Sequence, residues 1–176
     1  MLSPVEQPRF GAVCLISGPE SLLAERAVAR AISEARAERP AASVSTLEGA
    51  SIDLGQLAEA TGGSLFASDQ IVVIEGIDAL DPDLFDPVIH LATDPQDDLA
   101  LILVHPGGIR GKGLLDKLKK ARVDVVDCQP IKAWELPQFA VNEARTLGGR
   151  LDPATAAKLV EALGADVRAI AGAVRQ

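Results

Sequence analysis

Short apolar runs alternate with longer amphipathic stretches over the first 130 residues. The runs at 12–17, 71–74 and 99–104 are apolar at nearly every position, which is typical of strands buried on both faces of a parallel sheet. Weaker runs at 43–47 and 123–126 bring the predicted strands to five. Helices are predicted between them, from Pro19, over 53–60, over 82–91 and around 114–118. Parallel strands need crossover helices, so this alternation predicts a doubly wound α/β sheet.

The strand pattern ends near Pro130, and helical spacing continues to the end of the chain. Apolar residues from Trp134 to Leu147 suit one helix, Asp152-Pro153 begins a second, and Asp166 begins a third. The sequence therefore predicts an α/β domain over 1–129 and a small helical domain over 130–176, with no internal repeat.

Composition narrows the classes of function. Hydrophobic residues make up 48% of the 176 residues and charged residues 24%, as in globular proteins, and the net charge of −8 gives little surface for neutralising DNA phosphates. Cys14 and Cys128 lie in apolar runs and predict buried free thiols. The first ten residues hold no apolar signal segment, and no stretch is long enough to span a bilayer, so a cytoplasmic protein is expected.

The first strand–turn–helix junction is where a P-loop would lie. A P-loop needs Gly-x-x-x-x-Gly-Lys-Ser/Thr, because backbone N–H groups and a lysine hold the phosphates. Counted from Gly18, the second Gly, the Lys and the Ser/Thr are replaced by Leu23, Ala24 and Glu25. These residues fit either a plain strand–helix turn or a P-loop that has lost its function. In both cases no nucleotide binding and no cofactor are expected.

The remaining candidates for chemistry are isolated. Glu75 follows an apolar strand without a second acid, which favours a loop residue over a metal ligand. His90 and His105 have no Cys or carboxylate at ligand spacing, so structural roles are predicted and no metal is expected. The basic run over 110–122 has no interleaved aromatic residue, which favours a solvated helix face over a nucleic-acid site.

An apolar pair stands outside any periodic pattern. Leu65 and Phe66 follow Ser64 and a glycine pair, and polar residues come directly after them. Such a pair either covers an edge of the sheet or forms an exposed anchor for a pocket on a partner.

Several segments together resemble the delta subunit of the bacterial DNA polymerase III clamp loader. The likeness runs in order through 15–23, 64–74, 101–104, 149–156 and 163–167, which covers most of the chain. It implies an AAA+-like five-stranded parallel sheet with flanking helices, followed by a helical lid domain, with a collar domain missing after residue 176.

The resemblance also implies a role. Members of this family do not hydrolyse ATP and use a Ser-Leu-Phe segment, here Ser64, Leu65 and Phe66, to bind the ring-shaped sliding clamp and help open it. The implied partners are the clamp and the other loader subunits (delta prime and gamma/tau), with DNA contacted indirectly and no membrane, and this fragment is expected to be a monomer. A nucleotide-binding α/β enzyme with an unusual phosphate loop is the main alternative, and a receiver-like signalling domain is a third.

Overall fold

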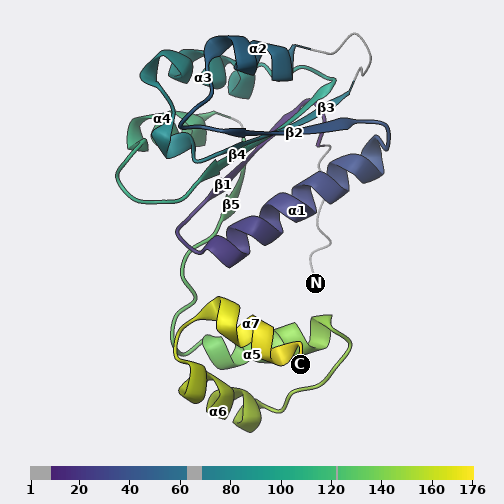
Figure 1. Ribbon diagram of the computed structural model, residues 1–176, viewed down its shortest axis with the longest axis vertical. Helices are drawn as coiled ribbons and strands as arrows, with labels where there is room; N and C mark the ends of the chain where they lie inside the picture. Colours follow the sequence, from purple (N-terminus) through teal and green to yellow (C-terminus); the bar gives the residue numbers. More distant parts are fainter. Residues whose placement is uncertain (1–8, 63–68, 122) are drawn as a thin grey trace. The chain divides into compact units, whose positions relative to one another are not determined.

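The computed structural model describes residues 9–62, 69–121 and 123–176, which form two compact units over Met1–Gln129 and Pro130–Gln176. The first unit contains the strands and the second contains helices only (Figure 1). The predicted Ser64, Leu65 and Phe66 lie outside the described residues. Among those described, no helix is long and apolar enough to cross a membrane.

The first unit is built on a five-stranded sheet whose strands are all parallel, in the order β2-β3-β4-β1-β5. The strands are β1 (Ala12–Ser17), β2 (Ser43–Glu48), β3 (Gln70–Glu75), β4 (Leu99–His105) and β5 (Asp124–Asp127). The helices between them are α1 (Ser21–Glu38), α2 (Leu54–Thr61), the short η1 (Ile77–Ala79) and η2 (Pro82–Leu84), α3 (Phe85–Thr93) and α4 (Lys112–Lys120). The predicted doubly wound sheet is confirmed.

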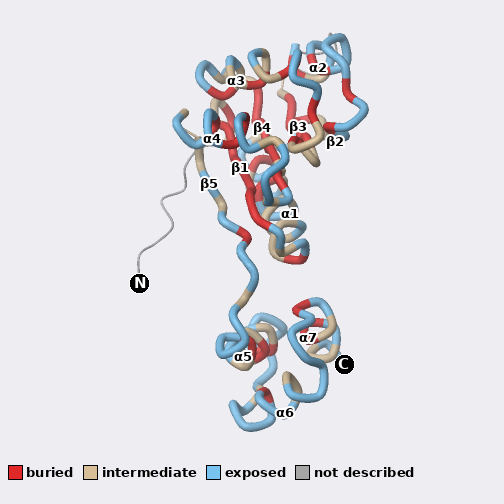
Figure 2. Tube along the Cα trace, turned by 90° about the vertical axis from the view of Figure 1, so that its left-hand side faces the viewer, coloured by how far each residue is buried: buried red, intermediate tan, exposed pale blue. Residues whose placement is uncertain are grey.

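The sheet is covered on both faces, and the alternation of side chains along each strand divides the core in two. Val13 and Leu15 of β1 point into a cluster with α2, α3 and α4, whereas Cys14 and Ile16 point into a cluster with α1. Within this unit, Figure 1 shows α1 on one side of the sheet and α2, α3 and α4 on the opposite side, and Figure 2 shows the central strands as the buried layer. The three central strands are apolar except at their ends, because both of their faces are buried.

The second unit consists of α5 (Leu136–Thr146), α6 (Pro153–Leu163) and α7 (Val167–Val174). Asp152 and Asp166 cap α6 and α7 as predicted, with side-chain oxygens that accept backbone N–H groups. Val167 and Ile170 of α7 are buried together with Leu136 and Ala140 of α5. The prediction that Trp134 belongs to the first of these helices is wrong, because Trp134 precedes α5 and is exposed, with the Lys132 ammonium 5.1 Å from its ring centre.

The start of α1 also differs from the prediction. Pro19 was expected in the first helical turn, but the helix begins at Ser21 and Glu20 is its N-cap. Glu20 has an extended backbone, and its carboxylate accepts a hydrogen bond from the Leu22 N–H at 3.3 Å. The capping carboxylate thus sets the boundary two residues later than the proline signal suggested.

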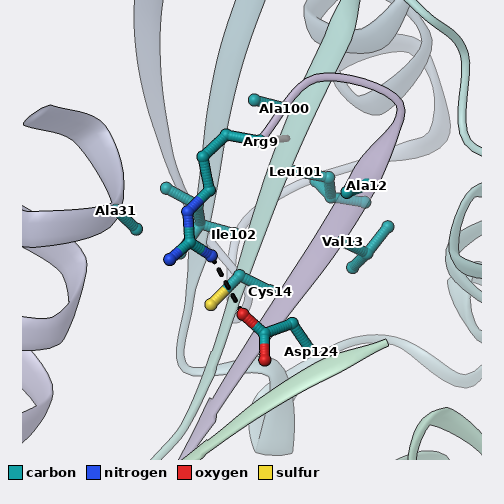
Figure 3. Close-up of a pocket in the computed structure, with 9 residues that line it drawn as sticks. All are labelled: Arg9, Ala12, Val13, Cys14, Ala31, Ala100, Leu101, Ile102 and Asp124. Atoms are coloured by element: carbon teal, nitrogen blue, oxygen red, sulfur yellow. Dashed lines mark hydrogen bonds and ion pairs between the residues drawn. The ribbon is translucent and has the colours of Figure 1, made fainter. Parts of the chain in front are cut away.

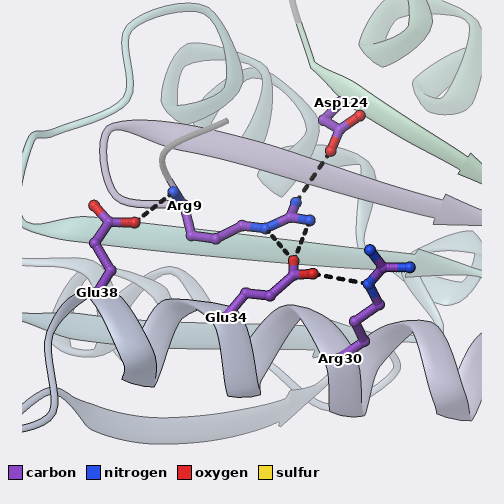
Figure 4. Close-up of polar contacts among 5 residues, drawn as sticks. All are labelled: Arg9, Arg30, Glu34, Glu38 and Asp124. Carbon is purple, nitrogen blue, oxygen red and sulfur yellow. Dashed lines mark hydrogen bonds and ion pairs between the residues drawn. The ribbon is translucent and has the colours of Figure 1, made fainter. Parts of the chain in front are cut away.

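A charged cluster around Arg9 connects the segment before β1 to two other elements. The Arg9 guanidinium lies beside Cys14 and donates to the Asp124 carboxylate of β5 at 3.0 Å (Figure 3). On the other side its Nε donates to Glu34 of α1 at 2.8 Å, and Arg30 also donates to Glu34 at 2.7 Å (Figure 4). The backbone N–H of Arg9 donates to Glu38 at 2.8 Å. The cluster therefore ties α1 and the edge strand β5 to the same residue.

Because of this cluster, we expect the folding stability of the protein to depend on pH. Hydrogen bonds from Arg30 and Arg9 lower the pKa of Glu34 below its ordinary value. Ionised Glu34 therefore contributes its full stabilisation of the fold at pH values above the unfolded-state pKa of about 4.3. This stabilisation is lost as the pH falls from there through the folded-state pKa, which is lower. We expect Glu34→Gln to lower the melting temperature at pH 7 by about 1–4 °C, and by less at pH 3.5. The measurement is thermal unfolding followed by far-UV circular dichroism at both pH values.

The matched control is Glu59→Gln, at an exposed carboxylate of α2 in the same unit. Equal destabilisation by Glu34→Gln at both pH values would contradict a charge-based role for Glu34.

Candidate functional site

The junction between β1 and α1 is a turn of only three residues, Gly18, Pro19 and Glu20. In a P-loop the chain must form a wide loop here, so that several backbone N–H groups converge on the phosphates. In this chain the residues that follow Glu20 are already helical. The positions at which a P-loop widens are therefore part of α1.

The backbone donors of this turn are used within the protein. The Gly18 N–H donates to the His105 carbonyl at 3.0 Å, and the Glu20 N–H donates to the Cys128 carbonyl at 3.0 Å. Pro19 has no N–H, and the Leu22 N–H is bonded to the Glu20 carboxylate. These are the groups that would otherwise face an anion at the N-terminus of a helix, and the carboxylate also complements the helix dipole there.

The turn is also closely packed between the ends of two strands. Gly18 has a left-handed φ of 147°, and a Cβ at this residue would lie 2.2 Å from the Cys128 carbonyl oxygen. On the other side, a Cβ on Gly107 would lie 3.1 Å from Cδ of Pro19. Backbone from beyond β5 and from the loop after β4 therefore occupies the space on both sides of the turn.

The three predicted replacement residues lie in the first turns of α1. Leu23 and Ala24 are partly buried against the core cluster beneath α1, whereas Glu25 is exposed. The Ala24 N–H donates to the Glu20 carbonyl in the regular helical pattern. Two of these three side chains are apolar and pack on the core, and the third is an exposed carboxylate. They do not include the lysine and the hydroxyl that a P-loop uses to bind a nucleotide with its Mg²⁺.

His105, at the end of β4, is fully buried and has both ring nitrogens bonded. Nδ1 accepts the Gly107 N–H at 3.0 Å, which assigns the proton to Nε2, and Nε2 donates to the Arg110 carbonyl at 3.0 Å. The structural role predicted for His105 is confirmed. The predicted structural role of His90 is untested, and this residue is exposed on α3.

Glu75 ends β3 and is partly exposed, and its backbone carbonyl accepts the Gly49 N–H at 2.7 Å. Within residues 9–62, 69–121 and 123–176, no group of three or more His, Cys, Asp or Glu side chains is placed to hold a metal ion. The prediction that Glu75 is a loop residue is wrong, because Glu75 is the last residue of β3 and pairs in register with Glu48 of β2.

A small pocket lies between β1 and α1 beside the Arg9 cluster (Figure 3). Its polar groups are the Arg9 guanidinium, the Asp124 carboxylate and the Cys14 thiol, and the rest of the lining is apolar. Burial raises the pKa of Cys14 to about 11 and also raises that of Cys128. Because the thiolate is the reactive form, this environment suits the predicted buried, unreactive thiols rather than a nucleophile.

The segment with Ser64, Leu65 and Phe66 lies outside the described residues, and the structure describes the residues on either side of it. Before it, the Thr61 hydroxyl at the end of α2 donates to the Leu57 carbonyl at 2.8 Å. After it, Asp69 forms an ion pair with Arg39, and the Gln70 N–H donates to the Asp98 carbonyl at 2.8 Å. The segment thus joins the end of α2 to the first residue of a buried strand.

Comparisons with known proteins were made by sequence and by structure. No protein-family model matches the chain, and no curated protein matches it by sequence. Solved structures similar to this chain include the DNA clamp loader delta protein of Bacillus subtilis, with a TM-score of 0.65 and 17% identity over 93% of this chain and 51% of that one.

Two other similar structures come from Thermotoga maritima. The Holliday junction branch migration motor RuvB has a TM-score of 0.60 and 15% identity, over 93% of this chain and 53% of that one. A DNA polymerase III gamma subunit-related protein has a TM-score of 0.53 and 13% identity, over 94% of this chain and 53% of that one.

These similarities define the class of fold. The five-stranded parallel sheet with flanking helices is that of AAA+ proteins, and the predicted fold class is confirmed. The chain spans about half the length of the solved structures it resembles. Identity this low shows the fold and leaves the activity open.

The geometry of the β1–α1 turn predicts that the chain binds no ATP. Three internally bonded amides and the absence of the P-loop lysine leave little to stabilise a triphosphate. Isothermal titration with ATP and Mg²⁺ is expected to give no saturable binding at micromolar concentrations. Saturable micromolar binding would contradict this account of the turn.

Proposed function

We propose that this chain is a clamp-loader subunit of the delta type, which binds a ring-shaped sliding clamp and helps open it without hydrolysing ATP. The observation that carries the proposal is the three-residue β1–α1 turn. In P-loop proteins the backbone N–H groups at this junction bind phosphates. Here the N–H groups of Gly18 and Glu20 are hydrogen-bonded within the protein instead. Without a nucleotide site at this junction, the proposed activity is the binding of another protein. Its similarity in fold to a clamp loader delta protein supports this choice.

The clamp contact in this proposal is the segment Ser64, Leu65 and Phe66. Adjacent aliphatic and aromatic side chains are frequent binding anchors, because they fill a partner's pocket with apolar surface at a small cost in conformational entropy. On either side of this segment, Thr61 is buried at the end of α2 and Asp69 forms an ion pair with Arg39.

The proposed setting is the bacterial cytoplasm, in an assembly with delta prime and gamma/tau subunits. The net charge of −8 fits a protein that reaches DNA through the clamp and the other subunits rather than by itself. In this setting the second unit corresponds to the lid domain, and the chain alone has no enzymatic activity and needs no cofactor.

The main competing function is a nucleotide-binding α/β enzyme with an unusual phosphate loop. The bonded amides of Gly18 and Glu20 argue against it, because a phosphate would have to displace two backbone hydrogen bonds of 3.0 Å.

Replacing both anchor residues tests the clamp contact. We expect Leu65→Ala with Phe66→Ala to weaken binding to the cognate clamp by at least about 30-fold, on the order of 2 kcal/mol, without a change in melting temperature. Affinity is measured by surface plasmon resonance on immobilised clamp, and stability by circular dichroism. If the two side chains are core instead, the double variant will melt at a strongly reduced temperature, since truncating a buried Phe costs about 3–5 kcal/mol.

A second consequence is that the chain should help unload a closed clamp in the absence of ATP. A partner shifts the opening equilibrium of the ring by its difference in affinity for the open and closed forms, and a shift from about 1% open to a majority needs roughly 3 kcal/mol. The assay is the loss of labelled clamp from nicked circular DNA, with the Leu65/Phe66 double variant as control. If the wild type binds tightly but unloads no faster than this control, the chain is a binding module only.

A further inference from the structure

A stretch of net positive charge lies on α4 and on the loop before it. Residues 110–120 contain five cations and one carboxylate, in a chain whose net charge is −8. All six of these side chains are exposed. The five cations, here named the basic face, are Arg110, Lys112, Lys117, Lys119 and Lys120.

The helix α4 separates its charged side chains from its apolar ones. It covers the side of the sheet opposite α1, and its three leucines are buried in the core cluster beneath it (Figure 1). With 3.6 residues per turn, its four lysines therefore point away from the core into solvent. No apolar side chain of α4 is exposed.

Most of the basic face has no counter-charge within the part of the chain that the structure describes. Lys117 lies 4.0 Å from the Asp86 carboxylate, and the other four cations form no ion pair. Asp116 is one helical turn from both Lys112 and Lys120, and it pairs with neither among the described residues. Around α1 the arginines do pair with carboxylates, as Arg9, Arg30 and Arg39 show.

The helix dipole accounts for only part of this charge. Lys117, Lys119 and Lys120 lie in the last turn of α4, where the dipole favours cations. Lys112 is the first residue of the helix and Arg110 comes just before it, at the end where the dipole disfavours positive charge. The first turn of α4 contains no acidic residue that would compensate. A solvated helix face therefore explains the lysines of the last turn but not Arg110 and Lys112.

A glycine on the same side of α4 is also unexplained by the fold. Gly113 comes four residues before Lys117 and seven before Lys120, so it shares their exposed side. A Cβ at Gly113 would meet no atom within 4 Å, and its φ is not positive. Glycine destabilises a helix relative to alanine, so neither packing nor backbone conformation favours it here. The missing side chain lets another molecule approach the helix backbone between the lysines.

These features select one class of ligand. A protein partner would need an apolar centre, and Ile109 in the preceding loop is a single exposed side chain. Single-stranded bases would need aromatic side chains to stack on, and residues 109–121 contain none. The phosphates of duplex DNA need unpaired cations on long side chains and a backbone that they can approach closely.

We propose that the basic face binds the phosphate backbone of duplex DNA directly and without sequence preference. This contact goes beyond the proposed function, in which DNA is reached through partners, and does not depend on it. The net charge of −8 opposes DNA over the rest of the surface, so the isolated chain binds weakly, with a Kd on the order of 10⁻⁴ M at low salt. Such a contact acts on DNA that a partner already holds nearby.

The test is fluorescence anisotropy of a labelled duplex of about 20 base pairs, titrated with the full chain at about 25 to 200 mM salt. Lys112→Gln with Lys119→Gln is expected to weaken DNA binding by at least about fivefold and to reduce the slope of log affinity against log salt by about 2. The matched control, Arg145→Gln with Lys158→Gln, removes two exposed cations from the second unit and is expected to leave both quantities unchanged.

A third variant tests the approach to the helix backbone without changing the charge. Gly113→Gln is expected to weaken DNA binding by at least about threefold, while the melting temperature stays the same or rises because glutamine is the better helix former. Unchanged DNA affinity of this variant, or a loss that comes with a lowered melting temperature, would contradict the role given to Gly113.

The remaining outcomes decide the assignment of the basic face. No binding of the wild type at about 25 mM salt, equal losses in the α4 variant and its control, or tighter binding of a single-stranded probe each overturn it. Clamp affinity is measured on the same proteins. If the α4 variant loses affinity for the clamp and keeps it for DNA, the basic face binds protein and the inference is wrong. If the wild type binds DNA through α4 but does not bind the clamp, the proposed function fails and the DNA contact stands.

Discussion

The arrangement of the first unit depends on the central strand β1 and the short turn that ends it. β1 lies between β4 and β5, so both of its faces and both of its edges are covered. The chain turns out of the sheet at Gly18, where the backbone of Cys128 is so close that no residue with a Cβ would fit. Hydrogen bonds from Gly18 to His105 and from Glu20 to Cys128 then tie this turn to the ends of both neighbouring strands. One small turn thereby fixes three strand ends.

The same turn determines whether a ligand can bind at the carboxyl end of the sheet. In open α/β sheets, ligands bind at this end because loops diverge there and leave a crevice. In this chain the β1–α1 turn, the loop after β4 and the residue after β5 are in contact and bonded to one another. The space that a nucleotide site would need at this end of the sheet is therefore filled by the protein's own backbone.

Much of the fold could be predicted from the sequence, because the central strands are buried on both faces and therefore appear as unbroken apolar runs. Boundaries were less certain where a side chain sets them, as at Glu20, whose capping carboxylate moves the start of α1 past Pro19. The Arg9 cluster was missed because it joins residues 9, 34 and 124, which no local pattern connects. The two hydrogen bonds from the His105 ring to the loop after β4 could not be predicted either, because they join a side chain to backbone atoms.

We propose that this protein binds a sliding clamp and that this binding does not depend on nucleotide. The most direct measurement is the affinity of the chain for a bacterial sliding clamp, determined by calorimetry with and without Mg²⁺-ATP. The account predicts binding with the same dissociation constant in both conditions, because the β1–α1 turn has no place for a triphosphate. Binding that appears or strengthens tenfold only with ATP, or no binding in either condition, would contradict it.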